Sequence, residues 1–179
     1  MDASPTPPWL VVIDMQVAFG DPLSEWTTHN YDRAEQVVSR LADGFEDRVV
    51  WTRFVRDPAE PGQWRSYYDR WPSFRVPEDD ALWELTLPVA AGARVLSRPS
   101  FSKWGPGLQA IVGDAPLVMC GVATECCVLG TVLAAADAGR QVTVVADACA
   151  GATEGLHGQA LVLMEQLDPL VRVTTSDRI

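Results

Sequence analysis

The strongest constraint on the fold is a regular alternation of short, continuously apolar runs with segments of helix length. Continuous apolar runs, in contrast to alternating ones, are typical of parallel strands that are buried on both faces. We therefore predict one α/β domain over residues 1–179, with three layers: a six-stranded parallel sheet and helices on both of its faces. The predicted strands are 9–13, 48–52, 93–97, 116–121, 142–146 and 170–173.

The segments between these runs predict helices, except for one long stretch. Helices are predicted at 31–45, 107–112, 124–138 and 154–167. The stretch 53–80 is rich in Pro, Arg and aromatic residues and has no steady period. A loop of that length inside a small domain is usually functional, so we predict a substrate loop or lid there.

Composition excludes several classes of function. Hydrophobic residues make up 47% and charged residues 21%, which is typical of a soluble globular protein. A net charge of −10 argues against a nucleic-acid partner, and the apolar runs are too short for a membrane span. The N-terminus has no basic residue before its apolar run, and the four cysteines include an adjacent pair. We therefore predict no signal peptide, no disulfide framework and a cytoplasmic location.

Ligands of open α/β sheets bind beyond the carboxyl ends of the strands, so the residues that follow the strands are the candidates. Asp14 follows the first strand and is a candidate base, with a helix cap or a loop hydrogen bond as the alternative role. The segment 122–127 follows the fourth strand and is expected to enter a helix with Thr124 as N-cap. Cys127 then lies in the first turn, where the helix dipole would lower its pKa.

The alternative for Cys127 is a small core residue. On a helix, Cys126 and Cys127 point about 100° apart, so only one of them is expected to face the strand ends.

Four segments resemble the isochorismatase-like cysteine hydrolases, and GVATECCV is the most specific of them. The resemblance extends from Val11 to about Leu167, and the family fold of six parallel strands agrees with the strand count above. The segments are VVIDMQVAF at 11–19, RPSFSKW at 98–104, GVATECCV at 121–128 and VVADACAG at 144–151.

The resemblance implies a Cys–Asp–Lys triad in which Cys127 is the nucleophile and Asp14 the acid. It also implies a non-proline cis peptide at Val122–Ala123, which turns the backbone N–H groups of Ala123 and Cys127 toward the substrate oxygen.

The third member of the triad departs from the family pattern. Aligned on Phe101-Ser102-Lys103-Trp104, the position of the family lysine holds Arg98. An arginine keeps the positive charge but does not release a proton. We favour Arg98 as a fixed cation; the alternatives are that Lys103, the only lysine, takes the family role, or that Lys103 faces solvent.

No metal or cofactor is predicted. The chain has only two histidines, His29 and His157, far apart in the sequence. Other members of the family bind a metal for nicotinamide through an Asp and two histidines after the second strand, and the segment 51–57 has no histidine. The resemblance therefore argues against a nicotinamidase.

Aromatic side chains are candidates for the walls of a pocket for a flat or apolar small-molecule substrate. We select Phe19, Trp64 and Trp104 as substrate-binding residues, and Tyr67, Tyr68 and Trp71 are further candidates. The alternative for each is packing in the core or at a subunit contact.

The predicted function is a metal-independent hydrolase that cleaves a C–N bond of a small amide or carbamoyl substrate through a thioester. The alternatives are an isochorismatase-type hydrolase, a non-catalytic binding protein and a thiol-redox protein that uses Cys126 and Cys127. Adjacent cysteines bridge only through a strained ring, which disfavours the redox alternative. We expect a homodimer or homotetramer.

Overall fold

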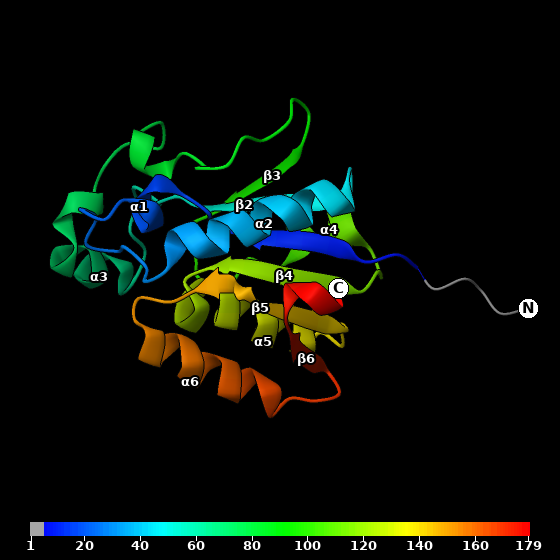
Figure 1. The fold of residues 1–179 in the computed structure, drawn as a ribbon. Coiled ribbons are helices and arrows are strands. Elements are labelled where there is room, and N and C mark those ends of the chain that lie inside the picture. The colour runs from blue at the N-terminus through cyan, green and yellow to red at the C-terminus, as the bar shows by residue number, and fades with distance from the viewer. Residues whose placement is uncertain (1–5) are drawn as a thin grey trace, which may run out of the picture.

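Six parallel strands form one sheet in the computed structural model, which describes residues 6–179. The strands lie in the order β3-β2-β1-β4-β5-β6 (Figure 1). With helices around this sheet, the predicted fold class is confirmed. The strands are β1 (Trp9–Ile13), β2 (Val49–Phe54), β3 (Arg94–Arg98), β4 (Leu117–Val122), β5 (Val142–Ala150) and β6 (Val171–Thr174).

Residues 1–5 lie outside the described residues, so part of the N-terminal segment used for the signal-peptide prediction lies outside them too. Within residues 6–179, every helix is too short or too polar to span a bilayer.

Helix α2 packs against one face of the sheet, where it contacts β1, β4 and β5, and α5 and α6 lie on the other side (Figure 1). The apolar residues of α2 recur at helical spacing, and the stripe that they form is buried. The helices are α1 (Val17–Gly20), α2 (Tyr31–Phe45), α3 (Trp64–Arg70), α4 (Pro106–Val112), α5 (Leu129–Asp137) and α6 (Glu154–Glu165), with the 3₁₀ turns η1 (Pro72–Phe74), η2 (Ala81–Trp83) and η4 (Ser176–Arg178).

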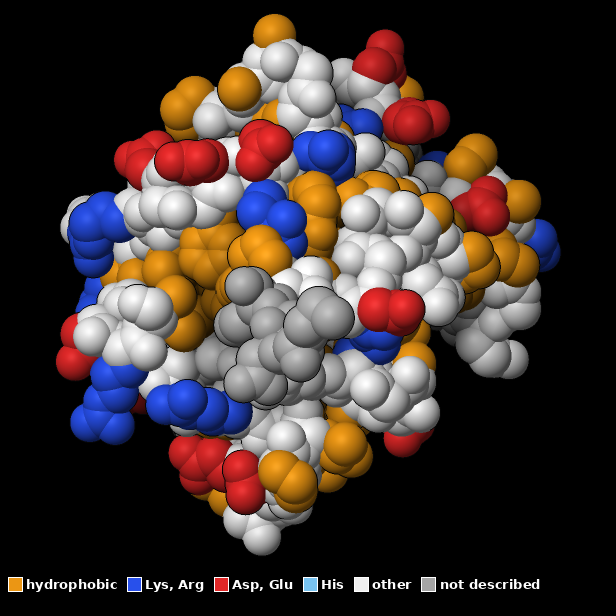
Figure 2. Space-filling model, turned by 90° about the vertical axis from the view of Figure 1, so that its right-hand side faces the viewer, with side chains coloured by type: hydrophobic (Ala, Val, Ile, Leu, Met, Phe, Trp, Pro, Cys, Tyr) orange, Lys and Arg blue, Asp and Glu red, His pale blue; other side chains and the backbone are white. Residues whose placement is uncertain are grey.

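The core lies along the two central strands. All six residues of β4 and four of the five residues of β1 are buried, which explains why both read as continuous apolar runs. The edge strand β3 has no buried residue. Figure 2 views the end of the molecule where the strands begin, and there acidic and basic side chains are interspersed among hydrophobic ones.

Two predicted segments differ from the structure. The stretch 53–80 contains α3 and η1, and the aromatic side chains of α3 contact one another. The predicted helix 124–138 is not one α-helix, because its first five residues form a π-helix, η3 (Thr124–Val128), that continues into α5. In this π-helix the Val128 N–H donates to the Ala123 carbonyl, 3.2 Å away. Single π-turns inside helices occur frequently at functional sites.

Candidate active site

Asp14 ends β1 in the left-handed region, with φ of 53°, a conformation that Asp tolerates better than most residues. The hydroxyl of Thr52, on the neighbouring strand β2, donates to Asp14 Oδ1 at 2.7 Å and accepts from the Asp14 N–H at 3.2 Å. Both side chains are fully buried. The neighbouring strand therefore fixes the carboxylate at the carboxyl edge of the sheet.

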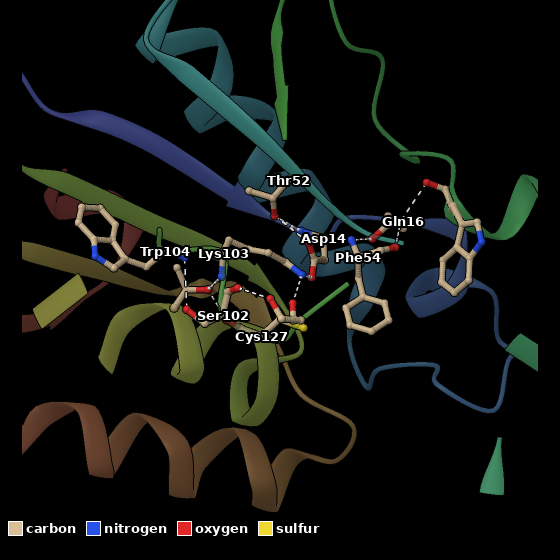
Figure 3. A network of polar contacts seen from close by, with 11 residues as sticks. Asp14, Gln16, Thr52, Phe54, Ser102, Lys103, Trp104 and Cys127 are labelled. Carbon is tan, nitrogen blue, oxygen red and sulfur yellow. Dashed lines mark hydrogen bonds and ion pairs between the residues drawn. The ribbon is translucent and has the colours of Figure 1, made fainter. Parts of the chain in front are cut away.

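Lys103 is the cation beside this carboxylate. Its Nζ lies 2.9 Å from Asp14 Oδ2, and it donates to the Ser100 carbonyl at 2.7 Å (Figure 3). Nζ also lies 4.8 Å from the centre of the Phe54 ring. The side chain is fully buried, so the ammonium depends on these partners to offset its lost hydration.

Arg98, the residue favoured for this place, lies elsewhere. Its Nη1 donates to the Trp104 carbonyl at 3.1 Å, and its guanidinium fills the space beside the Cα of Gly105. The side chain is only partly buried. We therefore correct the expected placement: after β3 the loop turns back and inserts Lys103 into the core, and the guanidinium of Arg98 packs against the backbone at Trp104 and Gly105. Lys103 does not face solvent either.

Cys127 lies in the π-helix next to Asp14 and Lys103 (Figure 3), and only 2% of it is exposed. Burial is the largest effect on its thiol and raises the pKa well above the usual value, and the charge of Asp14 adds to this while Lys103 opposes it. The expected lowering of this pKa is therefore wrong for the free site. The prediction considered the helix end alone and missed the desolvation and the adjacent carboxylate.

The expected geometry around Cys127 also needs two corrections. Thr124 makes no side-chain cap; its hydroxyl lies 2.9 Å from Nδ1 of His157 instead. Cys126 and Cys127 both line the same pocket, although an α-helical spacing would have turned one of them away. The π-helical backbone changes the angle between consecutive side chains, so the α-helical value does not apply.

Two further polar residues hold the cluster together, and the sequence analysis missed both. The hydroxyl of Thr131 accepts from the Lys103 N–H at 2.9 Å and donates to the Cys127 carbonyl at 2.6 Å. The buried amide of Gln16 bonds the Phe54 N–H and carbonyl and the carbonyl of Trp83 (Figure 3). Gln16 stands two residues after Asp14, and its polarity within an apolar stretch was the available signal.

The peptide bond Val122–Ala123 is cis, as the resemblance implied. Before it, Gly121 has φ of +117°, and a Cβ at this position would overlap the backbone of Ile13. Ala123 and Cys127 both line the pocket.

The pocket beside Cys127 is a cavity of about 210 Å³ with mainly aromatic walls. Phe19 lines it, as do Tyr67 and Trp71 from the wider set of candidates. Its lining residues are Phe19, Glu25, Trp26, Thr27, Phe54, Tyr67, Trp71, Phe101, Ala123, Glu125, Cys126, Cys127 and Ala152.

The selection of Trp64 and Trp104 is corrected, because neither residue lines this pocket. The Trp64 ring packs behind the wall, 5.2 Å from the centre of Phe101. Trp104 points away from Asp14 and Cys127 (Figure 3), and the guanidinium of Arg140 lies 6.0 Å from its ring. Trp26, Phe54 and Phe101 line the pocket instead. The sequence around them has no steady period, so it did not show which way their side chains point.

The loop after β2 contains a buried carboxylate that two arginines already occupy. Glu60 is the buried carboxylate of this loop, and it is occupied by Arg56 at 2.6 Å and by Arg75 at 2.8 Å. These bonds lower the pKa of Glu60 to about 2. Within residues 6–179 no three His, Cys, Asp or Glu side chains come together as a set of metal ligands.

The protein is a doubly wound α/β protein. A buried thiol, carboxylate and ammonium lie at the carboxyl ends of its parallel strands. The family model described as "Isochorismatase domain" matches residues 8–178, and the chain belongs to that family.

Similar proteins share part of the sequence or the fold of this chain. Isochorismatase domain-containing protein 2 of Rattus norvegicus is 38% identical over 80 residues, which are 42% of this chain and 38% of that protein. The match thus covers well under half of the relative. A cysteine hydrolase from Pseudomonas syringae pv. phaseolicola 1448A has a TM-score of 0.79 at 16% identity and covers 99% of this chain and 96% of its own. A pyrazinamidase of Pyrococcus horikoshii in complex with zinc has a TM-score of 0.76 at 23% identity, covering 94% and 98%.

Proposed function

We propose that this protein is a cysteine hydrolase that cleaves the C–N bond of a small amide or carbamoyl substrate through a thioester. The observation that carries the proposal is the meeting of Cys127, Asp14 and Lys103 beside an aromatic pocket. The name of one structural relative, a pyrazinamidase, denotes hydrolysis of an amide and supports the choice of bond. Lys103, rather than Arg98, takes the cationic role in this proposal.

The first half of the reaction forms the thioester. Burial raises the pKa of the Cys127 thiol, so the reaction needs a base, and the thiol proton passes to the Asp14 carboxylate as Sγ bonds to the carbonyl carbon. The backbone N–H groups of Ala123 and Cys127 stabilise the oxyanion of the tetrahedral intermediate. The intermediate collapses when the C–N bond breaks, and the leaving nitrogen takes the proton from Asp14. Lys103 Nζ, 2.9 Å from Asp14 Oδ2, holds this carboxylate in place.

The second half releases the acid. Asp14 takes a proton from a water molecule as the water oxygen bonds to the thioester carbon. The C–S bond then breaks, and the proton returns from Asp14 to Sγ, which restores the thiol. The fixed position of Asp14, held by Thr52 and Lys103, allows one carboxylate to serve both halves.

Mass spectrometry of the intact protein tests this proposal. Mixing with a panel of primary amides and carbamoyl compounds should yield a covalent acyl adduct on Cys127, with release of ammonia. Cys127→Ala should give neither product, and Cys149→Ala, at a cysteine outside this pocket, serves as the matched control that keeps the adduct. Ammonia release that persists in Cys127→Ala would refute the proposal.

A second candidate, isochorismatase-type cleavage of a vinyl ether, is less well supported. Isochorismate is a dicarboxylate, and the charged side chains that line the pocket are Glu25 and Glu125. Two acidic side chains repel a dianion. Turnover of isochorismate without an acyl adduct on Cys127 would favour this candidate.

A further inference from the structure

We propose that the pocket selects substrates with a cationic group, such as a quaternary or protonated amine, a few atoms from the scissile carbonyl. This inference rests on the proposed function and adds the class of substrate to it. Three features of the pocket support it: its charges, its aromatic walls and the fixed carboxylate of Glu125.

The charge of the lining is uncompensated. Glu25 and Glu125 line the pocket, and none of the other lining residues is Lys, Arg or His. Lys103 lies behind the lining, and its charge is balanced by Asp14 at 2.9 Å. Arg70 lies 5.1 Å from the centre of the Trp71 ring. Arg70 and Glu25 are both exposed, so solvent screens their charges, and the partly buried Glu125 is the main charge of the lining. The pocket thus favours cations over anions.

Six aromatic side chains form most of the remaining wall, namely Phe19, Trp26, Phe54, Tyr67, Trp71 and Phe101. The faces of aromatic rings attract cations, most strongly when water is excluded. Trp26 is held rigidly, because its ring stacks on Phe74 with 3.5 Å between centres and on Phe19 at 5.9 Å. Burial raises the pKa of Tyr67 to about 12, so its phenol stays neutral and adds no competing charge.

Glu125 supplies a fixed negative charge. Its Oε1 accepts from the Ala152 N–H at 2.9 Å, which fixes the carboxylate between the π-helix and the loop before α6. Its Oε2 is buried and has no hydrogen-bond partner among the described residues. Oε2 packs against Gly151 near His157, so the charge of Glu125 acts on a cation in the pocket through space and not through a direct hydrogen bond.

The position of Glu125 sets the distance to the cationic group. Glu125 lies two residues before Cys127 on the same π-helix. The cavity of about 210 Å³ is smaller than the range of roughly 300–1,000 Å³ typical of sites for drug-sized ligands. The cationic group and the scissile amide must therefore belong to one small molecule.

Three amides of similar size test the inference: glycine betaine amide, its uncharged tert-butyl isostere and the anion malonamate. Binding is measured on Cys127→Ala, which cannot turn them over, from the fluorescence of Trp26 and Trp71 in the pocket wall. We expect the cation to bind at least about 10-fold more tightly than its isostere, a difference of about 1.4 kcal/mol, and malonamate to bind most weakly. In the same background, Glu125→Gln should remove most of the selectivity. Glu165→Gln, an exposed residue on α6, should leave it unchanged.

Equal affinity for the cation and its isostere, or selectivity that survives Glu125→Gln, would overturn the inference. If Glu125→Gln does not fold, the same selectivity is measured on Glu25→Gln and at increasing salt concentration. Both changes should then reduce the preference for the cation. An acyl adduct formed on the unmodified protein without charge preference would sink this inference and leave the proposed function standing. Charge-selective binding without any acyl adduct would support this inference and refute the proposed function.

Discussion

Replacing Lys103 by methionine keeps most of its volume and removes the charge that faces Asp14. The Asp14 carboxylate would remain fully buried without its ion-pair partner. Breaking one side of such a pair destabilises proteins by about 3–5 kcal/mol. That loss is a large fraction of the roughly 5–15 kcal/mol by which domains are stable, so Lys103→Met should unfold at much lower urea concentration.

Arg98→Met is the matched control. Arg98 is only partly buried, and the bond that it donates to the Trp104 carbonyl is worth about 0.5–1.5 kcal/mol. The double variant Asp14→Asn/Lys103→Met removes both charges, so it should recover most of the stability lost in Lys103→Met.

Urea unfolding at neutral pH, followed by tryptophan fluorescence, measures these free energies, and ammonia release measures activity. We expect Lys103→Met to abolish turnover and Arg98→Met to reduce it only slightly. If Arg98→Met loses as much stability and activity as Lys103→Met, the assignment of the cation to Lys103 is refuted.

Three further predictions concern the thiol, a salt bridge and a glycine. Burial is the main cause of the raised pKa of Cys127, and the charge of Asp14 raises it further. Asp14→Asn removes that charge, so iodoacetamide should label Cys127 faster at neutral pH while turnover is lost; slower labelling would contradict this electrostatic account. The pKa of Glu60 is lowered from its usual value near 4.5 to about 2, so its contribution to stability is present above pH 4.5 and is lost as the pH falls through 2. Glu60→Gln should therefore lower the free energy of unfolding at pH 7 and flatten its pH dependence between 4.5 and 2, as acid-unfolding curves of both proteins would show. Gly121→Ala places a Cβ against the backbone of Ile13, and with φ of +117° it should destabilise the fold by several kcal/mol in urea unfolding; a loss below about 1 kcal/mol would contradict the contact.

The assembly and location of the protein stay predictions from the sequence. Multi-angle light scattering of the purified protein should give the mass of two or four chains, since one chain is 19.5 kDa. A mass of 19.5 kDa across concentrations would contradict the expected homodimer or homotetramer.

The sheet could be predicted from the sequence because its strands are buried on both faces, which makes the apolar runs continuous. The position of Asp14 at the end of β1 followed from the same pattern. The choice between Arg98 and Lys103 could not be made in this way. Spacing along a chain does not show how a loop turns back, and burial of Lys103 depends on Asp14 and Ser100, which tertiary structure brings to it.

The π-helix and the pocket walls were beyond sequence reasoning for related reasons. Five residues are too few to separate a π-helical period from an α-helical one, and the expectation that only one of Cys126 and Cys127 faces the site was wrong. Trp64 and Trp104 lie in segments without a steady period, where residue type does not fix the direction of a side chain.

The hydroxyl of Thr131 joins the backbones of Lys103 and Cys127, and Lys103 in turn reaches Asp14 at the end of β1. These groups come from distant parts of the chain. Strands β1 and β4 pair in the sheet, although about a hundred residues separate them in the sequence. Contacts of such long range form slowly during folding. A refolding chain should therefore regain the circular dichroism signal of its helices before it regains hydrolytic activity. The time at which activity returns then reports when the central sheet is complete.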